Sequence, residues 1–338
     1  DYTTGEGVVL LEPQSTNLLT YSEDFSNAAW QKQQSGISTI PTVTSNFSIS
    51  PSGIQDADRV IFNLNGGTTS NDFSQITLGT AVYTGDATNY VYIKSNTNDS
   101  YIMSVCTPTG SAVQKTITPN WQKFDATSLG AAQALTVRVR LRGGAESTSS
   151  FADVSMWGAQ VEALPYATSY IPTSGAIATR LADSVTGAGD ATTFNSTEGV
   201  LYAEMAALAD DLSGRQISLN NGTTDDRIQM YFDALSNKVS VFYKSQSGAT
   251  AFILSHILAD ITQFNKLAFK WKENDFALWS NGVEVATQTS GVTSIANTLT
   301  RLDFQQFNAT NKFKGKVKAL AVFNEALTDT ELTCLTTI

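Results

Sequence analysis

The sequence has one histidine and two cysteines among its 338 residues, so it lacks the side chains that many enzyme sites require. A Ser-His-Asp triad would need His256, but this residue lies in an apolar run that favours a structural role. One histidine and two separated cysteines also cannot build a usual zinc site. No glycine-rich phosphate-binding motif follows a strand and opens a helix. We therefore expect no catalytic residues of these kinds.

Cysteine is too scarce to form a disulfide framework. Cys106 and Cys334 stand one in each half of the chain. A bond between them and a pair of buried free thiols are both compatible with the sequence, and the free thiols are the favoured interpretation.

Charge is scarce as well, and its balance is acidic. Charged residues make up 15% of the chain and the formal net charge is −10, whereas typical soluble domains are roughly 25% charged. A nucleic-acid partner would need a basic footprint, which neither half offers, and an anionic membrane surface is disfavoured for the same reason. No apolar run approaches the roughly 20 residues of a membrane-spanning helix, so we expect no membrane insertion.

Threonine, serine, asparagine and glycine take the place of the missing charges, in a pattern of short strands. Apolar and polar residues alternate in 89–94, 136–142 and 266–272, which is typical of antiparallel strands with one buried face. Asn281-Gly282 lies between two such runs and predicts a type I′ hairpin. The predicted fold class is all-β, with two antiparallel β-sandwich (jelly-roll) domains in tandem.

The length of the chain predicts two domains, at roughly 100–200 residues each. Prolines and glycines interrupt residues 165–190, which we interpret as an ordered connector that forms no ladder. The predicted domains are residues 1–175 and residues 176–338. One short helix is expected at 329–335, because Thr328 and Glu331 match a capping box.

Segments of the first half follow one another in an order that resembles a known family. They are Asn17-Leu18-Leu19 with Phe25 and Trp30, Val91-Tyr92-Ile93-Lys94, Trp121-Gln122-Lys123-Phe124 and Phe151–Glu162. In this order they resemble the jelly-roll carbohydrate-binding modules of the xylan- and glucan-binding type. The resemblance implies a sandwich that binds sugar on its concave face.

The amino-acid sequences of three segments resemble those of a second group of proteins. Leu11–Leu19, Trp157–Glu162 and Thr168–Thr173 are similar to segments of bacteriophage tail-fibre and tail-spike proteins, which bind host-surface glycans. The similarity covers roughly residues 8–182. It implies a polysaccharide or cell-surface glycan as the partner, an extracellular or virion-surface location and, because such fibres are often trimers, a homotrimer.

The second half resembles the concanavalin A-like, laminin-G-like sandwich. The segments that carry this resemblance are Gly199–Glu204, Phe276–Val283 and Phe313–Leu332. The last of them is long and fairly specific, but it identifies a fold better than a ligand.

A sugar site needs flat aromatic rings and planar polar side chains on a rigid surface, because sugars present hydroxyls and faintly apolar faces. In the first half, strand alternation places Tyr90 and Tyr92 on the polar face, together with Arg138, Arg140 and Arg142. If the two strands are neighbours, these residues share one face. Arginines would then favour an anionic glycan. An ordinary solvated sheet face is the competing interpretation.

The second half offers a similar set. Alternation places Arg227, Gln229 and Tyr231 on the polar face of one strand. Trp279 has the parity opposite to Leu278 and stands beside the hairpin, so we expect it to be exposed. An ordinary solvent-exposed sheet face is again the competing interpretation.

A structural calcium ion is implied by the resemblance to the jelly-roll modules. The matching positions are Glu23 or Asp24 in the opening segment and Asp153 in the last strand. Carboxylates suit this hard cation. The family often has two acids where this chain has only Asp153, which predicts a weaker site or none.

These observations favour a non-catalytic, glycan-binding adhesin from a phage tail fibre or spike. Two alternatives stay open: the accessory carbohydrate-binding region of a secreted polysaccharide-degrading enzyme, and a structural virion decoration that binds no sugar. Glycoside hydrolysis needs two facing carboxylates. The E-x-D-x-x-E strand that retaining enzymes on the concanavalin-like fold share is absent, which leaves only a cryptic pair such as Asp225 with Asp303.

Overall fold

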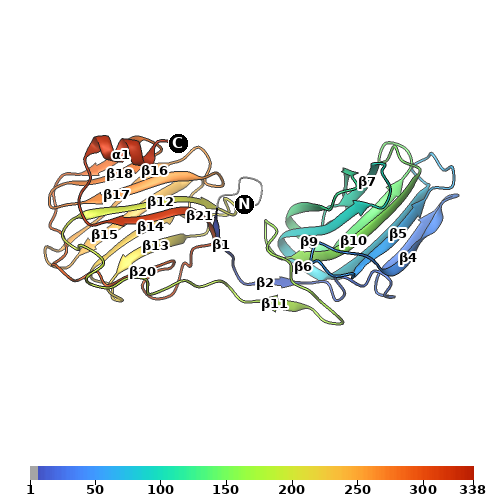
Figure 1. The fold of residues 1–338 in the computed structure, drawn as a ribbon, viewed down its shortest axis with the longest axis horizontal. Helices are drawn as coiled ribbons and strands as arrows, with labels where there is room; N and C mark the ends of the chain where they lie inside the picture. Colours follow the sequence, from blue (N-terminus) through green and yellow to red (C-terminus); the bar gives the residue numbers. More distant parts are fainter. Residues whose placement is uncertain (1–6) are drawn as a thin grey trace. The chain divides into compact units, whose positions relative to one another are not determined.

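A computed structural model describes residues 7–338, and it confirms the predicted all-β class. The chain forms two compact units (Figure 1). We call residues 14–181 the N-terminal unit, and residues 182–338 together with residues 7–13 the C-terminal unit. Each unit has its own hydrophobic core, as expected of a domain.

The division differs from the predicted one at both ends of the N-terminal unit, because two short strands pair across long stretches of sequence. β11 (Ala178–Arg180) pairs with β2 (Ser15–Asn17), which holds the chain in the N-terminal unit up to residue 181. β1 (Val9–Leu11) pairs with β21 (Gly315–Phe323) and so belongs to the C-terminal unit. The connector thus contains a short ladder that its prolines and glycines did not predict.

The N-terminal unit is built around a long ribbon of two antiparallel strands, β6 and β9. Its sheet has the order β4-β5-β10-β6-β9-β7-β8, and β3 also pairs with β6. The strands are β3 (Gln31–Ser35), β4 (Thr39–Ser48), β5 (Ala57–Asn63), β6 (Phe73–Ser95), β7 (Tyr101–Cys106), β8 (Ala112–Ile117), β9 (Gln122–Arg142) and β10 (Phe151–Glu162).

The two ends of the ribbon have different neighbours. Residues 73–79 pair with β3 and with residues 136–142, whereas residues 88–95 pair with β10. Alternation sends the apolar residues of both ends into one core, including Ile76, Val91 and Val139. This arrangement gives a sandwich with one buried face on each layer.

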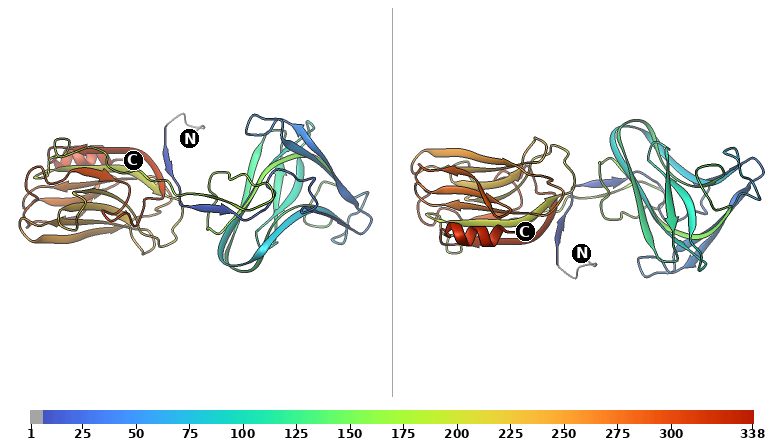
Figure 2. Two further views of the ribbon diagram at one scale, coloured as in Figure 1. Left: turned by 90° about the horizontal axis from the view of Figure 1, so that it is seen from below. Right: turned by 90° about the horizontal axis from the view of Figure 1, so that it is seen from above.

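The C-terminal unit has two separate sheets, which Figure 2 shows edge-on as two layers of strands. The six-stranded sheet has the order β1-β21-β12-β17-β18-β19, and the five-stranded sheet has the order β16-β15-β14-β13-β20. The further strands are β12 (Gly199–Ala207), β13 (Arg215–Asn220), β14 (Arg227–Phe232), β15 (Lys238–Ser245), β16 (Thr250–Ile257), β17 (Asn265–Trp271), β18 (Phe276–Ser280), β19 (Val283–Gln288) and β20 (Arg301–Asp303).

The main core of this unit lies between the two sheets, where Leu201, Ile217 and Trp271 are fully buried. The outer face of the six-stranded sheet is covered by α1 (Asp329–Thr336). This helix has the predicted capping box: the Thr328 hydroxyl accepts from the Glu331 amide, and the Glu331 carboxylate accepts from the Thr328 amide. These bonds hold the pKa of Glu331 below its ordinary value.

Other local predictions have mixed outcomes. The turn between β18 and β19 has positive φ at both Asn281 and Gly282, as a type I′ hairpin requires. Both cysteines are free, but only Cys106 is buried, since Cys334 lies on the exposed side of α1. In the part of the chain that the structure describes, no helix has the length and hydrophobicity needed to span a membrane.

Candidate functional site

The predicted tyrosines of the N-terminal unit are packed within a row of aromatic rings. Tyr90 is fully buried and Tyr92 is half-buried. Ring centroids are 6.0 Å apart for Tyr90 and Tyr92, 5.5 Å for Tyr92 and Trp157, and 4.5 Å for Trp157 and Tyr170. The Lys123 ammonium lies 3.9 Å from the centre of the Tyr90 ring. The prediction that Tyr90 is displayed to solvent is therefore wrong, because its ring already has partners.

The arginines of this unit do not join the tyrosines on one face. Tyr90 pairs with Asp125 on β9, whereas Arg138 pairs with Thr77 at the other end of the ribbon. Arg140 is 9% exposed and bonds to Glu146 at 2.6 Å. The strands are neighbours as expected, but a ribbon this long places the two sets on different stretches. Whether Tyr92, Arg138 or Arg140 contacts a sugar stays a prediction.

The residues predicted to hold calcium do not all come together, because Glu23 and Asp24 line one pocket and Asp153 is not part of its lining. Asp153 forms two hydrogen bonds with the guanidinium of Arg59. Glu23 accepts from the Tyr170 hydroxyl at 2.8 Å, and Asp24 accepts from its neighbour Ser26. Among the described residues, no three His, Cys, Asp or Glu side chains form a group that could hold a metal ion. The predicted ligand set is not assembled, and calcium binding itself stays a prediction.

The C-terminal unit presents its predicted polar residues in a groove. Ile228, Met230 and Phe232 are fully buried, which confirms the parity of β14 and turns Arg227, Gln229 and Tyr231 to the outer face of the five-stranded sheet. An open groove of about 390 Å³ lies on this face. Its lining includes Gln216, Arg227, Gln229, Tyr231, Phe242 and Asn311.

Arg227 is held at one end of the groove by aromatic rings and a loop. Its guanidinium lies 4.7 Å from the centre of the Phe242 ring and 5.0 Å from that of Phe307. It also donates to the backbone carbonyl of Thr224 and, at 3.4 Å, to Oε1 of Gln229. Burial lowers the pKa of Arg227, although the nearby carboxylate of Asp225 acts in the opposite direction.

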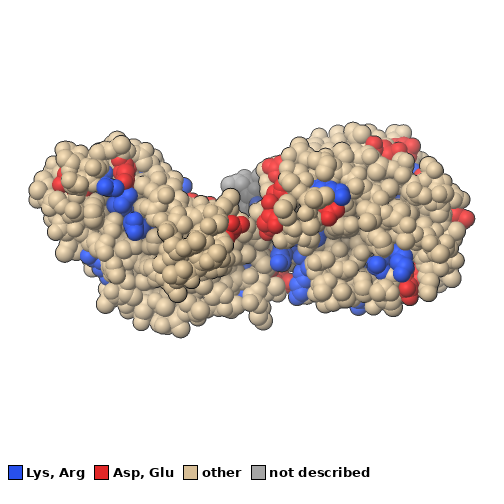
Figure 3. Space-filling model, turned by 180° about the vertical axis from the view of Figure 1, so that it is seen from behind, with Lys and Arg blue, Asp and Glu red and all other residues tan. Residues whose placement is uncertain are grey.

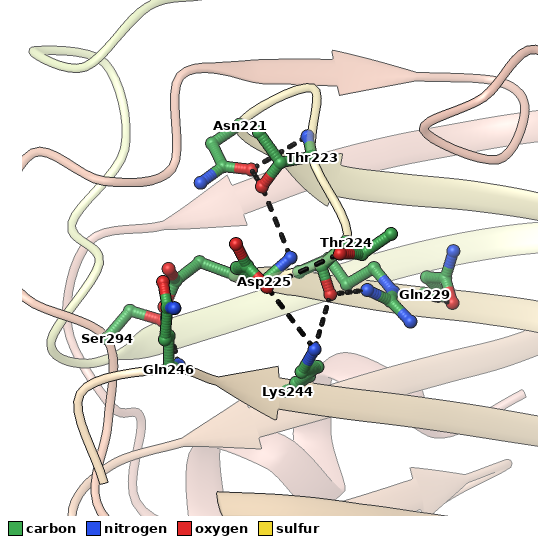
Figure 4. Close-up of polar contacts among 10 residues, drawn as sticks. Asn221, Thr223, Thr224, Asp225, Gln229, Lys244, Gln246 and Ser294 are labelled. Atoms are coloured by element: carbon green, nitrogen blue, oxygen red, sulfur yellow. Dashed lines mark hydrogen bonds and ion pairs between the residues drawn. The ribbon is translucent and has the colours of Figure 1, made fainter. Parts of the chain in front are cut away.

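The loop that accepts from Arg227 connects β13 to β14 and has its own anchors. Figure 4 shows Lys244 pointing toward Thr224 and Asp225. The Lys244 ammonium donates to the Thr224 carbonyl at 2.9 Å and lies 3.5 Å from the Asp225 carboxylate. The same loop ends at Asp226, which accepts from Ser294 at 2.8 Å. These bonds give the groove an ordered rim.

The Nε2 donors of two amide side chains in the groove lack an acceptor in the described part of the chain. Gln216 is 4% exposed and Gln229 is 5% exposed. The Nε2 atom of each is buried and has no hydrogen-bond acceptor among the described residues. Buried polar groups are nearly always paired in folded proteins, and those left unpaired call for an explanation. Both residues line a groove that is open to solvent, so a ligand could supply the missing acceptors if the terminal amides turn toward it.

The other end of the groove contains Tyr231 and Asp233. Burial raises the pKa of Tyr231, so its hydroxyl is protonated and can donate. Burial also acts to raise the pKa of Asp233, but hydrogen bonds from Ser240 and Lys238 hold it below its ordinary value. Asp233 is thus an anion paired with Lys238 at 3.1 Å.

Neither residue of the suggested cryptic carboxylate pair lines this groove. Asp303 is fully buried and bonds to Arg301 and to Asn220. Asp225 pairs with Lys244 at the rim. The two carboxylates are therefore engaged in structural contacts.

Trp279 was expected at the surface, and this expectation is wrong. Its side chain is 5% exposed and packs with Tyr202 and with Leu332 of α1. Parity did place it opposite Leu278, but the helix covers that face of the sheet.

Sequence reasoning named Arg227, Gln229 and Tyr231 and missed the other residues that line the groove. Gln216 and Phe242 alternate with the buried residues Ile217 and Val241, so strand parity could have found both. Asn311 is contributed by a loop, and no sequence pattern points to it.

The comparisons with known proteins agree with the architecture of the C-terminal unit. Residues 183–333 match the family model described as the concanavalin A-like lectin/glucanases superfamily. The C-terminal unit has the concanavalin A-like fold. No curated protein matches the chain.

Similar solved structures have low sequence identity to this chain. One is domains LG4-5 of the mouse laminin alpha1 chain, with 10% identity and a TM-score of 0.30, covering 88% of this chain and 94% of that one. Another is the CBM22-1-CBM22-2 tandem domain of Paenibacillus barcinonensis Xyn10C, with 12% identity and a TM-score of 0.30, covering 92% of this chain and 98% of that one. A third is a pentraxin of Limulus polyphemus, with 12% identity and a TM-score of 0.33, covering 41% of this chain and 69% of that one.

Proposed function

We propose that the chain is a non-catalytic glycan-binding protein and that the groove on its concanavalin A-like unit holds the saccharide. The observation that carries this proposal is the pair of buried Nε2 donors without acceptors on Gln216 and Gln229, two residues that line a solvent-open groove. A buried donor without an acceptor costs about 1–3 kcal/mol. The hydroxyl oxygens of a sugar are acceptors that would relieve this cost.

The rest of the lining matches the same chemistry. The half-buried ring of Phe242 offers an apolar surface to the C–H face of a sugar, and Tyr231 and Asn311 offer polar groups beside it. The description of the matching family model names lectins and glucanases. Lectins bind glycans and glucanases cleave them. That description supports a saccharide over other polar ligands.

The groove offers poor support for hydrolysis. Asp233 is the one carboxylate among its lining residues, and Lys238 and Ser240 hold that carboxylate. Cleavage of a glycosidic bond by the usual route needs a second carboxylate across the bond. We therefore propose a role in binding alone.

We further propose that the protein is an adhesin of a phage tail fibre or spike, located outside the cell or on the virion and assembled as a homotrimer. This part rests on the resemblance of Leu11–Leu19, Trp157–Glu162 and Thr168–Thr173 to segments of such fibres. The surface is compatible with display in solution. In the view of Figure 3, basic and acidic side chains form small scattered groups on a mostly uncharged surface.

The test is a glycan array probed with the intact chain and with a double variant, Gln216→Ala with Gln229→Ala. Gln288→Ala is the matched control, because Gln288 lies on β19 in the other sheet. We expect the intact chain and the control to bind the same glycans, and the double variant to lose at least tenfold in affinity while still unfolding in a cooperative transition. An intact chain that binds no glycan, or a double variant that binds normally, would contradict the proposal.

A further inference from the structure

Arg227 differs from most arginines of this protein in having no carboxylate partner. Five arginines of the described chain form ion pairs with Asp or Glu, namely Arg59, Arg140, Arg142, Arg215 and Arg301. Arg227 forms no ion pair with any described residue and points into the groove. A cation that is partly removed from water without an anion carries a desolvation cost.

The surroundings of Arg227 keep its charge available. The guanidinium lies against the rings of Phe242 and Phe307, which contact the cation without neutralising it. Nε and one terminal nitrogen donate to Gln229 and to the Thr224 carbonyl. The second terminal nitrogen has no hydrogen-bond partner among the described residues. The side chain is thus held in place with one terminal nitrogen still able to donate.

The nearest acid does not neutralise this charge. Asp225 acts on Arg227 through space, but its carboxylate pairs with Lys244 at the rim, as Figure 4 shows. Asp233 lies six residues further along the strand direction, about 20 Å away at 3.3 Å per residue, and it pairs with Lys238. The groove therefore has one uncompensated positive end.

We propose that the groove selects acidic saccharides, with the carboxylate of a uronate-type sugar bound by Arg227. A guanidinium edge matches a planar carboxylate, and a charge-assisted hydrogen bond is stronger than a neutral one. The next sugar residues would then lie over Gln229 and Gln216, whose Nε2 donors lack acceptors and suit neutral hydroxyls. This inference rests on the proposed function, since it names the class of sugar that the same groove binds.

The inference explains why the arginine lies between rings. Desolvation strengthens the pull of a cation on an anion, because the effective dielectric constant is lower than in water. A solvated surface lysine would give a weaker and less directional contact. The same arrangement would still bind a neutral sugar with lower affinity, since hydroxyl oxygens also accept from a guanidinium.

The experiment measures affinity for matched pairs of oligosaccharides by titration calorimetry. Oligomers of galacturonate, glucuronate, mannuronate and guluronate are each compared with their carboxyl-reduced, neutral counterparts. The proteins are the intact chain, Arg227→Gln, Arg227→Lys and the control Lys272→Gln. Lys272 is a cation that does not line the groove and pairs with Glu198.

We expect at least one acidic oligomer to bind about tenfold or more tightly than its neutral counterpart. Arg227→Gln should remove this preference, so that the acidic oligomer binds no more tightly than its neutral counterpart, and Arg227→Lys should restore part of it. Lys272→Gln should keep the preference. The preference should also shrink as salt is raised.

The outcomes separate the two proposals. If neither member of any pair binds, the proposed function fails and this inference fails with it. If the neutral and acidic members bind equally, the glycan groove stands and the selection by Arg227 is refuted. An acidic preference that survives Arg227→Gln would also refute it. If the Arg227→Gln variant binds the neutral oligomers and has an unchanged Tm, the variant is folded.

Discussion

Replacing Gln216 by methionine should make the protein more stable and less able to bind glycan. The amide of Gln216 is buried, its Nε2 has no acceptor among the described residues, and the side chain is 4% exposed. Methionine is unbranched, flexible and apolar, so it can occupy a similar volume without a polar group. The substitution removes a buried donor and no hydrogen bond that the side chain makes with a described residue.

The expected size follows from the cost of an unpartnered donor, which is about 1–3 kcal/mol. Partial access to solvent in the groove reduces this cost, so we expect the free energy of unfolding to rise by about 1 kcal/mol. For a unit of this length, that rise corresponds to roughly 2–4 °C in Tm. Glycan affinity should fall about tenfold, which is the loss of one hydrogen bond of about 1.4 kcal/mol.

Calorimetric melting of the intact chain, with and without an array-selected glycan, gives both quantities. Gln288→Met is the matched control, because the Gln288 amide donates to the carbonyl and to the hydroxyl of Ser290 at 2.8 and 3.0 Å. This control should lose up to about 1 kcal/mol and keep its glycan affinity. The reasoning is refuted if Gln216→Met destabilises the protein as the control does, or if it stabilises the protein without loss of binding.

Three further predictions concern the scaffold. Trp279→Ala should lower the free energy of unfolding by about 3–5 kcal/mol, because Trp279 is buried beneath α1; a urea titration that shows a loss below 1 kcal/mol would place the ring at the surface. Gly158→Ala should cost about 1–2 kcal/mol in the same assay, since Gly158 has a φ of 63° and a Cβ there would lie 3.2 Å from the Tyr92 ring; an unchanged midpoint would argue against this geometry. Hydrogen bonds from two threonines lower the pKa of Asp190 from 3.8 to about 2, so its contribution to stability is present above pH 4 and lost as pH falls toward 2. The free energy of unfolding of Asp190→Asn should therefore depend less on pH in this range. Identical acid titrations of the variant and the unaltered chain would refute the shift.

Local patterns in the sequence predicted the elements well, because each depends on neighbours in the chain. The alternation of Ile228, Met230 and Phe232 placed Arg227, Gln229 and Tyr231 on the correct face. The Asn281-Gly282 turn and the capping box of α1 depend on a few adjacent residues and were also predicted.

The failures involve contacts between residues far apart in sequence. Alternation places Trp279 on the outer face of its sheet, but it cannot show that α1 covers that face. It likewise cannot show that Tyr90 and Arg138 occupy opposite ends of the β6–β9 ribbon, because register depends on the pairing of whole strands. The ladder between β2 and β11, which places residues up to 181 in the N-terminal unit, is also a contact between residues far apart in sequence.

Hydroxyl-radical footprinting of the intact chain, with and without an array-selected glycan, tests the central claim most directly. Tyr231 and Phe242 are half-exposed in the groove, and Tyr92 is a half-buried aromatic residue of the N-terminal unit. If the groove binds the saccharide, glycan should lower the oxidation of Tyr231 and Phe242 and leave Tyr92 unchanged. Protection of Tyr92 alone, or no protection of Tyr231 and Phe242 at saturating glycan, would contradict the assignment of the site to the groove.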